Sequence, residues 1–203
     1  MKQAVTRISL LRHGKLATDG LFCAHADESL SKQGVKSLII ATEKGNWDVI
    51  VSSPHLRCKA FAEQLAEQKS CELHIEDSFK EMDFGRWTGV AMSTLWDNEA
   101  EQLQQLWQSP DDFMAPNGES MADFVARIHE GLQHIQQRYQ HQSVLLITHA
   151  GVIRTILAKA LGVSLLSAQK FAIDYASLTC LHHYSDGEYA LQSLQQVKDL
   201  EDV

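Results

Sequence analysis

Three short apolar runs constrain the fold of this chain more than any other feature. They lie at residues 6–11 (TRISLL), 48–52 (DVIVS) and 144–148 (VLLIT), and each is almost uninterrupted by charge. Runs of this kind are typical of strands buried on both faces, as in a parallel sheet covered by helices. Longer amphipathic stretches separate them and predict helices over residues 31–44, 54–69, 92–108, 120–141 and 152–161. This alternation predicts an α/β fold, a three-layer sandwich with a mostly parallel central sheet.

Local signals refine this prediction. Ser53 and Pro54 indicate a helix start, with serine as the cap and proline at the first helical position, and Ser120 followed by Asp123 is a weaker signal of the same kind. Residues 171–184 and 189–194 predict two closing strands joined by a turn at 186–187. Because the chain contains no Gly/Ser-rich linker, we expect a single domain over residues 1–203.

Composition excludes several classes of protein. The chain has 203 residues and a formal net charge of −8, which argues against nonspecific binding to nucleic acid. It contains no apolar run of the roughly 18 residues that a membrane span requires, and its start does not resemble a signal peptide. The cysteines are scattered and form no disulfide framework or zinc pattern: Cys23, Cys58, Cys71 and Cys180. We therefore expect a cytoplasmic protein with reduced thiols, no membrane partner and no nucleic-acid partner.

Polar residues follow each of the three predicted strands. Arg12-His13-Gly14 follows the first, Ser53-Pro54 and then Arg57 follow the second, and His149-Ala150-Gly151 follows the third. Ligands of open α/β sheets bind outside the carboxyl ends of the strands, so we expect two histidines and two arginines to meet there. The glycines would let a ligand approach the backbone, and the helix after His149 would direct its positive end towards an anion.

This set of groups suits a phosphate. Guanidinium groups bind phosphate oxygens in pairs and stay charged, and a neutral imidazole nitrogen can attack phosphorus. A leaving alkoxide also needs a proton, and the nearest candidate acids are Glu81 and Asp83, close to aromatic side chains. Spacing alone leaves open which histidine is the nucleophile and which carboxylate is the acid.

Five motifs in order resemble the histidine phosphatase superfamily, also called phosphoglycerate mutase-like. They are Arg12-His13-Gly14, Ser52-Ser53-Pro54 with Arg57, residues 80–87 (KEMDFGRW), residues 117–120 (NGES) and residues 148–151 (THAG). The resemblance implies that His13 is the phosphorylated nucleophile and Glu81 the proton donor. It also implies that Arg12, Arg57 and His149 bind phosphate together with Ala150 at the helix start, without a metal ion or other cofactor.

Two segments depart from the family pattern. The segment after Gly14, residues 15–19 (KLATD), is shortened, so that an asparagine which touches phosphate in the family has no clear counterpart. In residues 24–31 (AHADESLS), Ala24 stands where the family has glycine and Ser29 where it has proline. These changes affect the loop that faces the substrate rather than the phosphate-binding motifs.

The segment between Glu81 and Asn117 is short, which favours hydrolysis over mutase chemistry because a mutase must shield its phosphohistidine from water. Among the short members of the family, residues 81–87, 116–120 and 171–174 most resemble the alpha-ribazole phosphatases. We expect a small phosphorylated substrate, alpha-ribazole 5′-phosphate. The alternatives are a broad-specificity or sugar-phosphate phosphatase, then a phosphoglycerate mutase or a non-catalytic binding protein of the same fold. A metal-dependent hydrolase would need a carboxylate-rich cluster that we do not find in the sequence.

Overall fold

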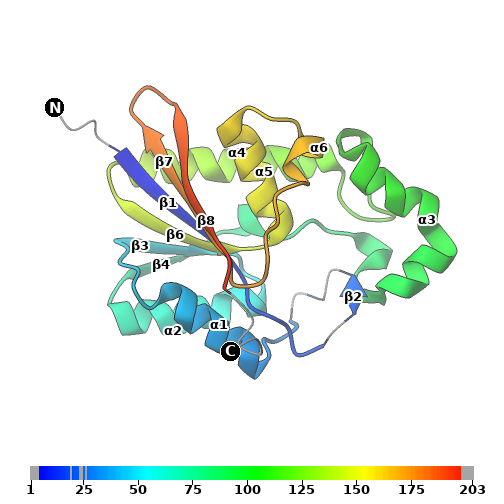
Figure 1. The fold of residues 1–203 in the computed structure, drawn as a ribbon, viewed down its shortest axis with the longest axis horizontal. Helices are drawn as coiled ribbons and strands as arrows, with labels where there is room; N and C mark the ends of the chain where they lie inside the picture. The colour runs from blue at the N-terminus through cyan, green and yellow to red at the C-terminus, as the bar shows by residue number, and fades with distance from the viewer. Residues whose placement is uncertain (1–4, 19, 23–24, 26, 198–203) are drawn as a thin grey trace.

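A six-stranded sheet in the order β4-β3-β6-β1-β7-β8 forms the centre of the computed structural model, which describes residues 5–18, 20–22, 25 and 27–197 (Figure 1). Four of its strands are parallel: β1 (Val5–Arg12), β3 (Val49–Ser52), β4 (Glu72–Ile75) and β6 (Ser143–Thr148). The closing strands β7 (Leu178–Tyr184) and β8 (Tyr189–Gln195) are antiparallel to their neighbours. The mostly parallel sheet that the sequence predicts is confirmed.

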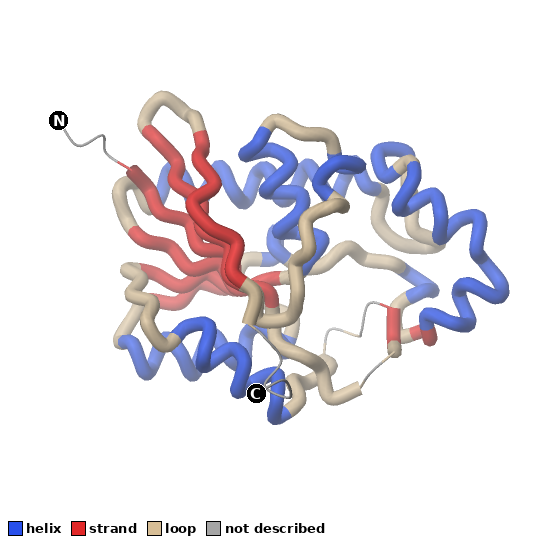
Figure 2. Tube along the Cα trace, in the orientation of Figure 1, coloured by secondary structure: helices blue, strands red, loops and turns tan. Residues whose placement is uncertain are grey.

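Helices cover both faces of this sheet (Figure 2). The helices α1 (Lys32–Thr42) and α2 (Leu56–Lys69) lie on one face, and α4 (Met121–Arg138) and α5 (Ala150–Leu161) lie on the other. Successive strand residues point to opposite faces, so that Leu145 and Ile147 pack towards α2 while Val144 and Leu146 pack towards α4 and α5. This double burial explains why the strands are continuous apolar runs.

A separate part of the chain lies beyond the carboxyl ends of the parallel strands. It contains the short strand pair β2 (Leu21–Phe22) and β5 (Val90–Ala91) and the helix α3 (Met92–Gln108) (Figure 1). Three 3-10 turns, η1 (Asp77–Phe79), η2 (Gly85–Trp87) and η3 (Pro110–Asp112), and the short helix α6 (Leu165–Ala168) complete the chain. No helix in the described ranges is long and apolar enough to cross a membrane.

Of the two predicted caps, one is confirmed and one is wrong. The hydroxyl of Ser120 accepts a hydrogen bond from the Asp123 N–H at the start of α4, as predicted. The helix after Pro54, however, begins at Leu56, and His55 at its cap position makes no side-chain cap bond. The hydroxyl of Ser53 faces His149 instead, 2.8 Å from its Nε2 atom, and is therefore part of the site.

Candidate active site

The two histidines after β1 and β6 lie side by side. These strands are parallel neighbours with Arg12 opposite Thr148, so the next residues, His13 and His149, meet at the same edge. The His13 N–H donates to the Thr148 carbonyl over 2.9 Å, and the two imidazole rings are 5.2 Å apart between centroids. The predicted convergence at the strand ends is confirmed.

The hydrogen bond of His13 determines which ring nitrogen is free. Its Nδ1 lies 2.9 Å from the Gly14 carbonyl oxygen, which can only accept, so Nδ1 carries the proton and Nε2 keeps its lone pair. Burial, followed by the charges of Arg12 and Arg57, lowers the pKa of His13 well below its usual value. The ring is therefore neutral at neutral pH, which is the state that a nucleophile requires.

Arg12 is held at the end of β1 by the segment that precedes β7. Its Nη1 donates to the Ile173 carbonyl over 2.7 Å, and its guanidinium lies 4.0 Å above the Tyr175 ring. Its Nε is buried without a hydrogen-bond partner among the described residues. Because Arg12 lines the cavity described below, this N–H is available to a group bound there.

Arg57 and His149 are linked beneath the site. The Arg57 Nε donates to the His149 Nδ1 over 3.4 Å, which leaves the His149 Nε2–H to donate to the Ser53 hydroxyl. His149 is fully buried, and its pKa is lowered well below the usual value by burial and by the charges around it. In this structure His149 orients Arg57 and does not line the cavity described below; its contact with phosphate stays a prediction.

Glu81 reaches the site from a segment without regular structure between η1 and η2. Its carboxylate accepts hydrogen bonds from the Met82 N–H over 3.2 Å and from the Gly151 N–H over 3.3 Å, the latter at the start of α5. Asp83, the other candidate acid, faces away. Its carboxylate accepts from the Gly85 N–H over 2.8 Å, and it is absent from the cavity lining. Of the two candidate acids, Glu81 lines the cavity and Asp83 does not; the role of Glu81 as proton donor stays a prediction.

The structure corrects the expected role of Gly14 and adds a second role for Gly151, which lines the cavity. A Cβ atom at Gly14 would lie 2.3 Å from the Gly34 carbonyl oxygen, so this glycine permits a close crossing of the loop over α1 rather than the approach of a ligand. A Cβ atom at Gly151 would lie 2.4 Å from the Glu81 Oε1. Gly151 thus provides space for the carboxylate of Glu81.

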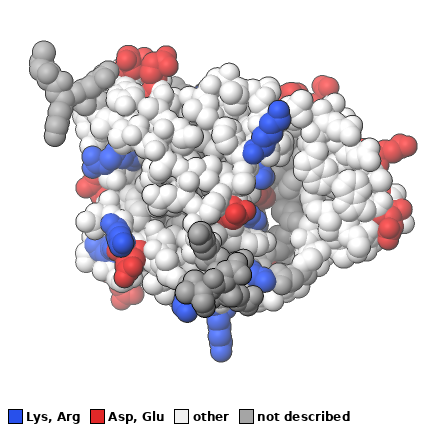
Figure 3. All heavy atoms as spheres, in the orientation of Figure 1, with Lys and Arg blue, Asp and Glu red and all other residues white. Residues whose placement is uncertain are grey.

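A cavity of about 370 Å³ joins these groups. Arg12, His13, Arg57, Glu81 and Ala150 line its polar end. The remaining walls are mostly apolar and include Phe22, Phe84, Met92, Leu106, Trp107, Met121, Phe124 and Leu165. In the space-filling view a hollow opens between α3 and the body of the molecule, with basic and acidic atoms visible in it (Figure 3).

Sequence reasoning missed several residues of the site. Arg154, one helical turn after Ala150, lines the cavity, and its Nε donates to the Phe171 carbonyl over 3.2 Å. Tyr175 lines the cavity beside Arg12, and His55 packs on His149 with 5.0 Å between ring centroids. The spacing of Ala150 and Arg154 at i and i+4 was the one available signal, since such residues share a helix face.

Asp19, Cys23, Ala24 and Ala26 lie outside the described residues, so the structure does not address the prediction on Ala24. In the described part of this loop, the Ala17 N–H donates to the Ser29 carbonyl over 3.0 Å. Within the described ranges, no group of three or more histidine, cysteine, aspartate or glutamate side chains is arranged to hold a metal ion.

Comparisons with known proteins place this site in a family. The chain is 28% identical to phosphoserine phosphatase 1 of Hydrogenobacter thermophilus over 183 residues, covering 88% of this chain and 87% of that protein. It is 23% identical to the adenosylcobalamin/alpha-ribazole phosphatase of Escherichia coli over 173 residues, covering 83% and 85%. A bifunctional protein of Mycobacterium tuberculosis is 27% identical over 197 residues, but the chain spans only 54% of its length.

A solved structure and a family model point to the same family as these relatives. The crystal structure of the alpha-ribazole phosphatase from Shigella flexneri superposes with a TM-score of 0.80 at 24% identity, over 94% of this chain and 96% of that one. The model of the histidine phosphatase superfamily (branch 1) matches residues 8–196, a range that holds both histidines, the arginines and Glu81. This chain therefore belongs to the histidine phosphatase superfamily, and it is a phosphatase of that family.

Proposed function

We propose that this phosphatase hydrolyses a phosphomonoester through a phosphohistidine on His13, without a metal ion. The observation that carries the proposal is the hydrogen bond from the His13 Nδ1–H to the Gly14 carbonyl. This bond leaves the other nitrogen of the neutral ring, Nε2, with a free lone pair at the polar end of the cavity. Arg12 and Arg57 would bind the phosphate oxygens, with the Ala150 N–H at the start of α5.

In the first step, His13 Nε2 forms a bond to phosphorus while the ester P–O bond breaks, and the Glu81 carboxyl gives its proton to the departing oxygen. In the second step, water attacks the phosphorus, its proton passes to the Glu81 carboxylate, and the N–P bond breaks to release inorganic phosphate. Glu81 suits both steps because its carboxylate lines the cavity at the same end as His13.

Rapid quenching with labelled substrate tests this mechanism. The wild-type chain should yield a phosphoenzyme that is stable in base and labile in acid, and the His13→Ala variant should yield none while retaining its fold. A label recovered on serine, or turnover by His13→Ala, would overturn the proposal. Activity retained after dialysis against a strong chelator would support independence from metal ions.

We further propose alpha-ribazole 5′-phosphate as the substrate. The cavity is larger than a phosphate requires, and its outer walls are formed by aromatic and aliphatic side chains, which suit a bulky leaving group with an apolar face. One of the relatives is an adenosylcobalamin/alpha-ribazole phosphatase. The experiment is a comparison of kcat/KM across alpha-ribazole phosphate, sugar phosphates, phosphoglycerates and phosphoserine.

Arg154 favours a second candidate, a substrate with a carboxylate on its leaving group, such as phosphoserine. Its side chain lines the cavity, and its terminal nitrogens make no hydrogen bond or ion pair within the described part of the chain. A guanidinium in that position can bind a carboxylate in a bidentate manner. Another relative is a phosphoserine phosphatase. A preference for phosphoserine in the substrate comparison would select this candidate.

The single domain over residues 1–203, the cytoplasmic location and the absence of a nucleic-acid partner stay predictions. Of the four cysteines, Cys58, Cys71 and Cys180 are free thiols in the structure.

A further inference from the structure

The segment that carries Glu81 depends on another element for its position. Residues 80–84, between η1 and η2, form neither helix nor strand. The Lys80 N–H and the Phe84 carbonyl are hydrogen-bonded within the flanking 3-10 turns, whereas the Glu81 carbonyl is bonded to a side chain of α4. Within the described residues, the Glu81 carboxylate accepts two long hydrogen bonds, of 3.2 and 3.3 Å, and both come from backbone N–H groups. The position of the Glu81 carboxylate therefore depends on the position of the Glu81 main chain.

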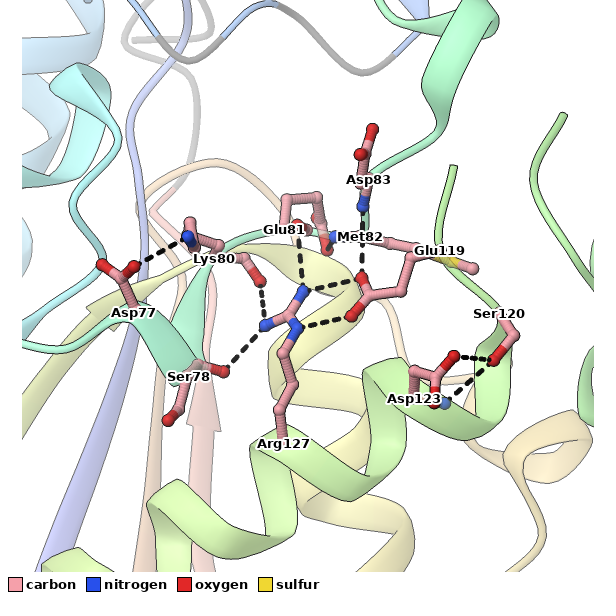
Figure 4. A network of polar contacts seen from close by, with 10 residues as sticks. All are labelled: Asp77, Ser78, Lys80, Glu81, Met82, Asp83, Glu119, Ser120, Asp123 and Arg127. Atoms are coloured by element: carbon pink, nitrogen blue, oxygen red, sulfur yellow. Dashed lines mark hydrogen bonds and ion pairs between the residues drawn. The ribbon is translucent and has the colours of Figure 1, made fainter. Parts of the chain in front are cut away.

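One guanidinium donates hydrogen bonds to carbonyl groups of this segment and of the 3-10 turn before it. Arg127, on α4, donates from Nη1 to the Ser78 and Lys80 carbonyls over 2.8 and 2.9 Å, and from Nη2 to the Glu81 carbonyl over 3.2 Å (Figure 4). These are charge-assisted bonds to three carbonyls within four consecutive residues. Figure 4 shows Arg127 reaching up from the helix into the turn of the segment.

Glu119 holds Arg127 in that orientation and also binds the segment. Its carboxylate accepts from Arg127 Nε over 2.7 Å and from Nη2 over 2.9 Å, and from the Asp83 N–H over 3.3 Å. The Glu119 N–H donates to the Asp83 carbonyl over 2.8 Å. The side chains of Arg127 and Glu119 are only 23% and 15% exposed, so solvent screens the pair less than it would a surface ion pair.

We propose that Arg127 is a positioning residue for the proton transfer: with Glu119, it fixes the main chain at Glu81 so that the carboxylate lies against the start of α5 and faces the departing oxygen. This proposal rests on the proposed function, in which Glu81 is the proton donor. Arg127 does not line the cavity, so it acts through Glu81 and not on the substrate. A misplacement of about 1 Å in a reacting group can cost about 10²-fold in rate.

The test uses Arg127→Gln and measures the phosphorylation step by rapid mixing, with an alkyl phosphate and with 4-nitrophenyl phosphate. Nitrophenolate leaves without a proton, whereas an alkoxide requires one. We expect the variant to slow the alkyl ester about 10- to 100-fold and the nitrophenyl ester less than threefold, with unchanged inhibition by vanadate. Arg138→Ala, on the same helix, is the matched control and should alter neither rate.

A double-mutant cycle separates positioning from general damage. If Arg127 acts through Glu81, the Arg127→Gln change should slow the alkyl ester little further in a Glu81→Gln background. Additive losses, or equal losses for both esters, would overturn the inference. Should Arg127→Gln fail to fold, Glu119→Gln loosens the same guanidinium and should give the same leaving-group contrast.

The outcome for Glu81→Gln alone distinguishes this inference from the proposed function. If Glu81→Gln shows no contrast between the two esters, Glu81 is not the proton donor and the proposed mechanism fails. If Glu81→Gln shows the contrast and Arg127→Gln does not, the mechanism stands and only the positioning role is rejected.

Discussion

The carboxylate of Glu81 occupies the space that a side chain at Gly151 would fill. A Cβ atom there would lie 2.4 Å from Glu81 Oε1, and the Gly151 N–H donates to Oε2 over 3.3 Å. Since the obstructing atom is the end of a flexible side chain, the Gly151→Ala variant should fold and displace the carboxylate.

We therefore expect Gly151→Ala to slow phosphorylation by an alkyl phosphate about tenfold or more, and to change the rate with 4-nitrophenyl phosphate much less. Rapid-mixing kinetics would measure both rates, and inhibition by vanadate would show whether the groups proposed to bind phosphate are still in place. Equal slowing of both esters would show that the helix start, and not the carboxylate, is disturbed.

Removing the hydroxyl of Ser53 should affect stability and activity together. Ser53→Ala removes the hydroxyl acceptor of the buried His149 Nε2–H and leaves it the weak acceptor Cys58 Sγ, 3.8 Å away, which costs about 1–3 kcal/mol in the free energy of unfolding. His149 also accepts from Arg57, so we expect a higher KM and weaker vanadate inhibition.

Ser52→Ala is the matched control for this change. The Ser52 hydroxyl is equally buried, but it donates to the Ser53 carbonyl and not to a residue of the site. Urea unfolding should detect a loss in both variants, whereas steady-state kinetics should detect one only in Ser53→Ala. A kinetic defect of equal size in Ser52→Ala would refute the role of the hydroxyl.

Stability should fall as the pH falls below about 6.5, in part through buried histidines. Burial lowers the pKa of His55 to about 4, and the pKa values of His13 and His149 are also well below 6.5. The unfolded chain protonates these rings near pH 6.5 while the folded chain keeps them neutral, so protons favour unfolding in this range.

Urea unfolding between pH 7.5 and pH 4 measures this effect. His55→Gln should show a shallower loss of stability across the range than the wild type, because one of the linked groups is gone. If His55→Gln leaves the slope of the free energy of unfolding against pH unchanged, the lowered pKa of His55 is contradicted.

Arg154 distinguishes the two candidate substrate classes. If its guanidinium binds a carboxylate of the leaving group, Arg154→Gln should raise the KM for phosphoserine tenfold or more, since a charge-assisted bond contributes about 1.5–3 kcal/mol. The KM for alpha-ribazole phosphate should then change little. A similar rise in KM for both substrates would assign Arg154 to the phosphate end or to holding the Phe171 carbonyl.

The parts of the site that follow from sequence are those fixed by parallel pairing. His13 and His149 follow buried runs, and neighbouring parallel strands bring their carboxyl ends to one edge whatever the details of packing. The strand β4 was missed because it is four residues long, lies at the sheet edge and has no fully buried residue. A strand with these three properties leaves no clear periodic pattern in the sequence.

Other contacts could not be predicted because they join residues far apart in the chain. The serine before Pro54 has the sequence of a helix cap, and only the tertiary structure turns its hydroxyl to His149. Likewise, Glu81 and Asp83 are both carboxylates, two residues apart and close to aromatic residues, so the sequence does not distinguish them as candidate acids. Their difference arises because Asp83 bonds to the Gly85 N–H while Glu81 meets the start of α5.

The groups that would bind phosphate and those that surround the leaving group come from different stretches of the chain. Arg12 ends a strand of the central sheet, and His13, Arg57 and Ala150 follow such strands, whereas a continuous segment, residues 82–124, supplies most of the apolar wall. Substrate preference can therefore diverge by exchange of one segment while the reaction chemistry is inherited unchanged. Residues 88–115 hold three residues of this wall, Met92, Leu106 and Trp107, so a chimaera that carries this stretch from a relative should shift its substrate preference towards that of the relative.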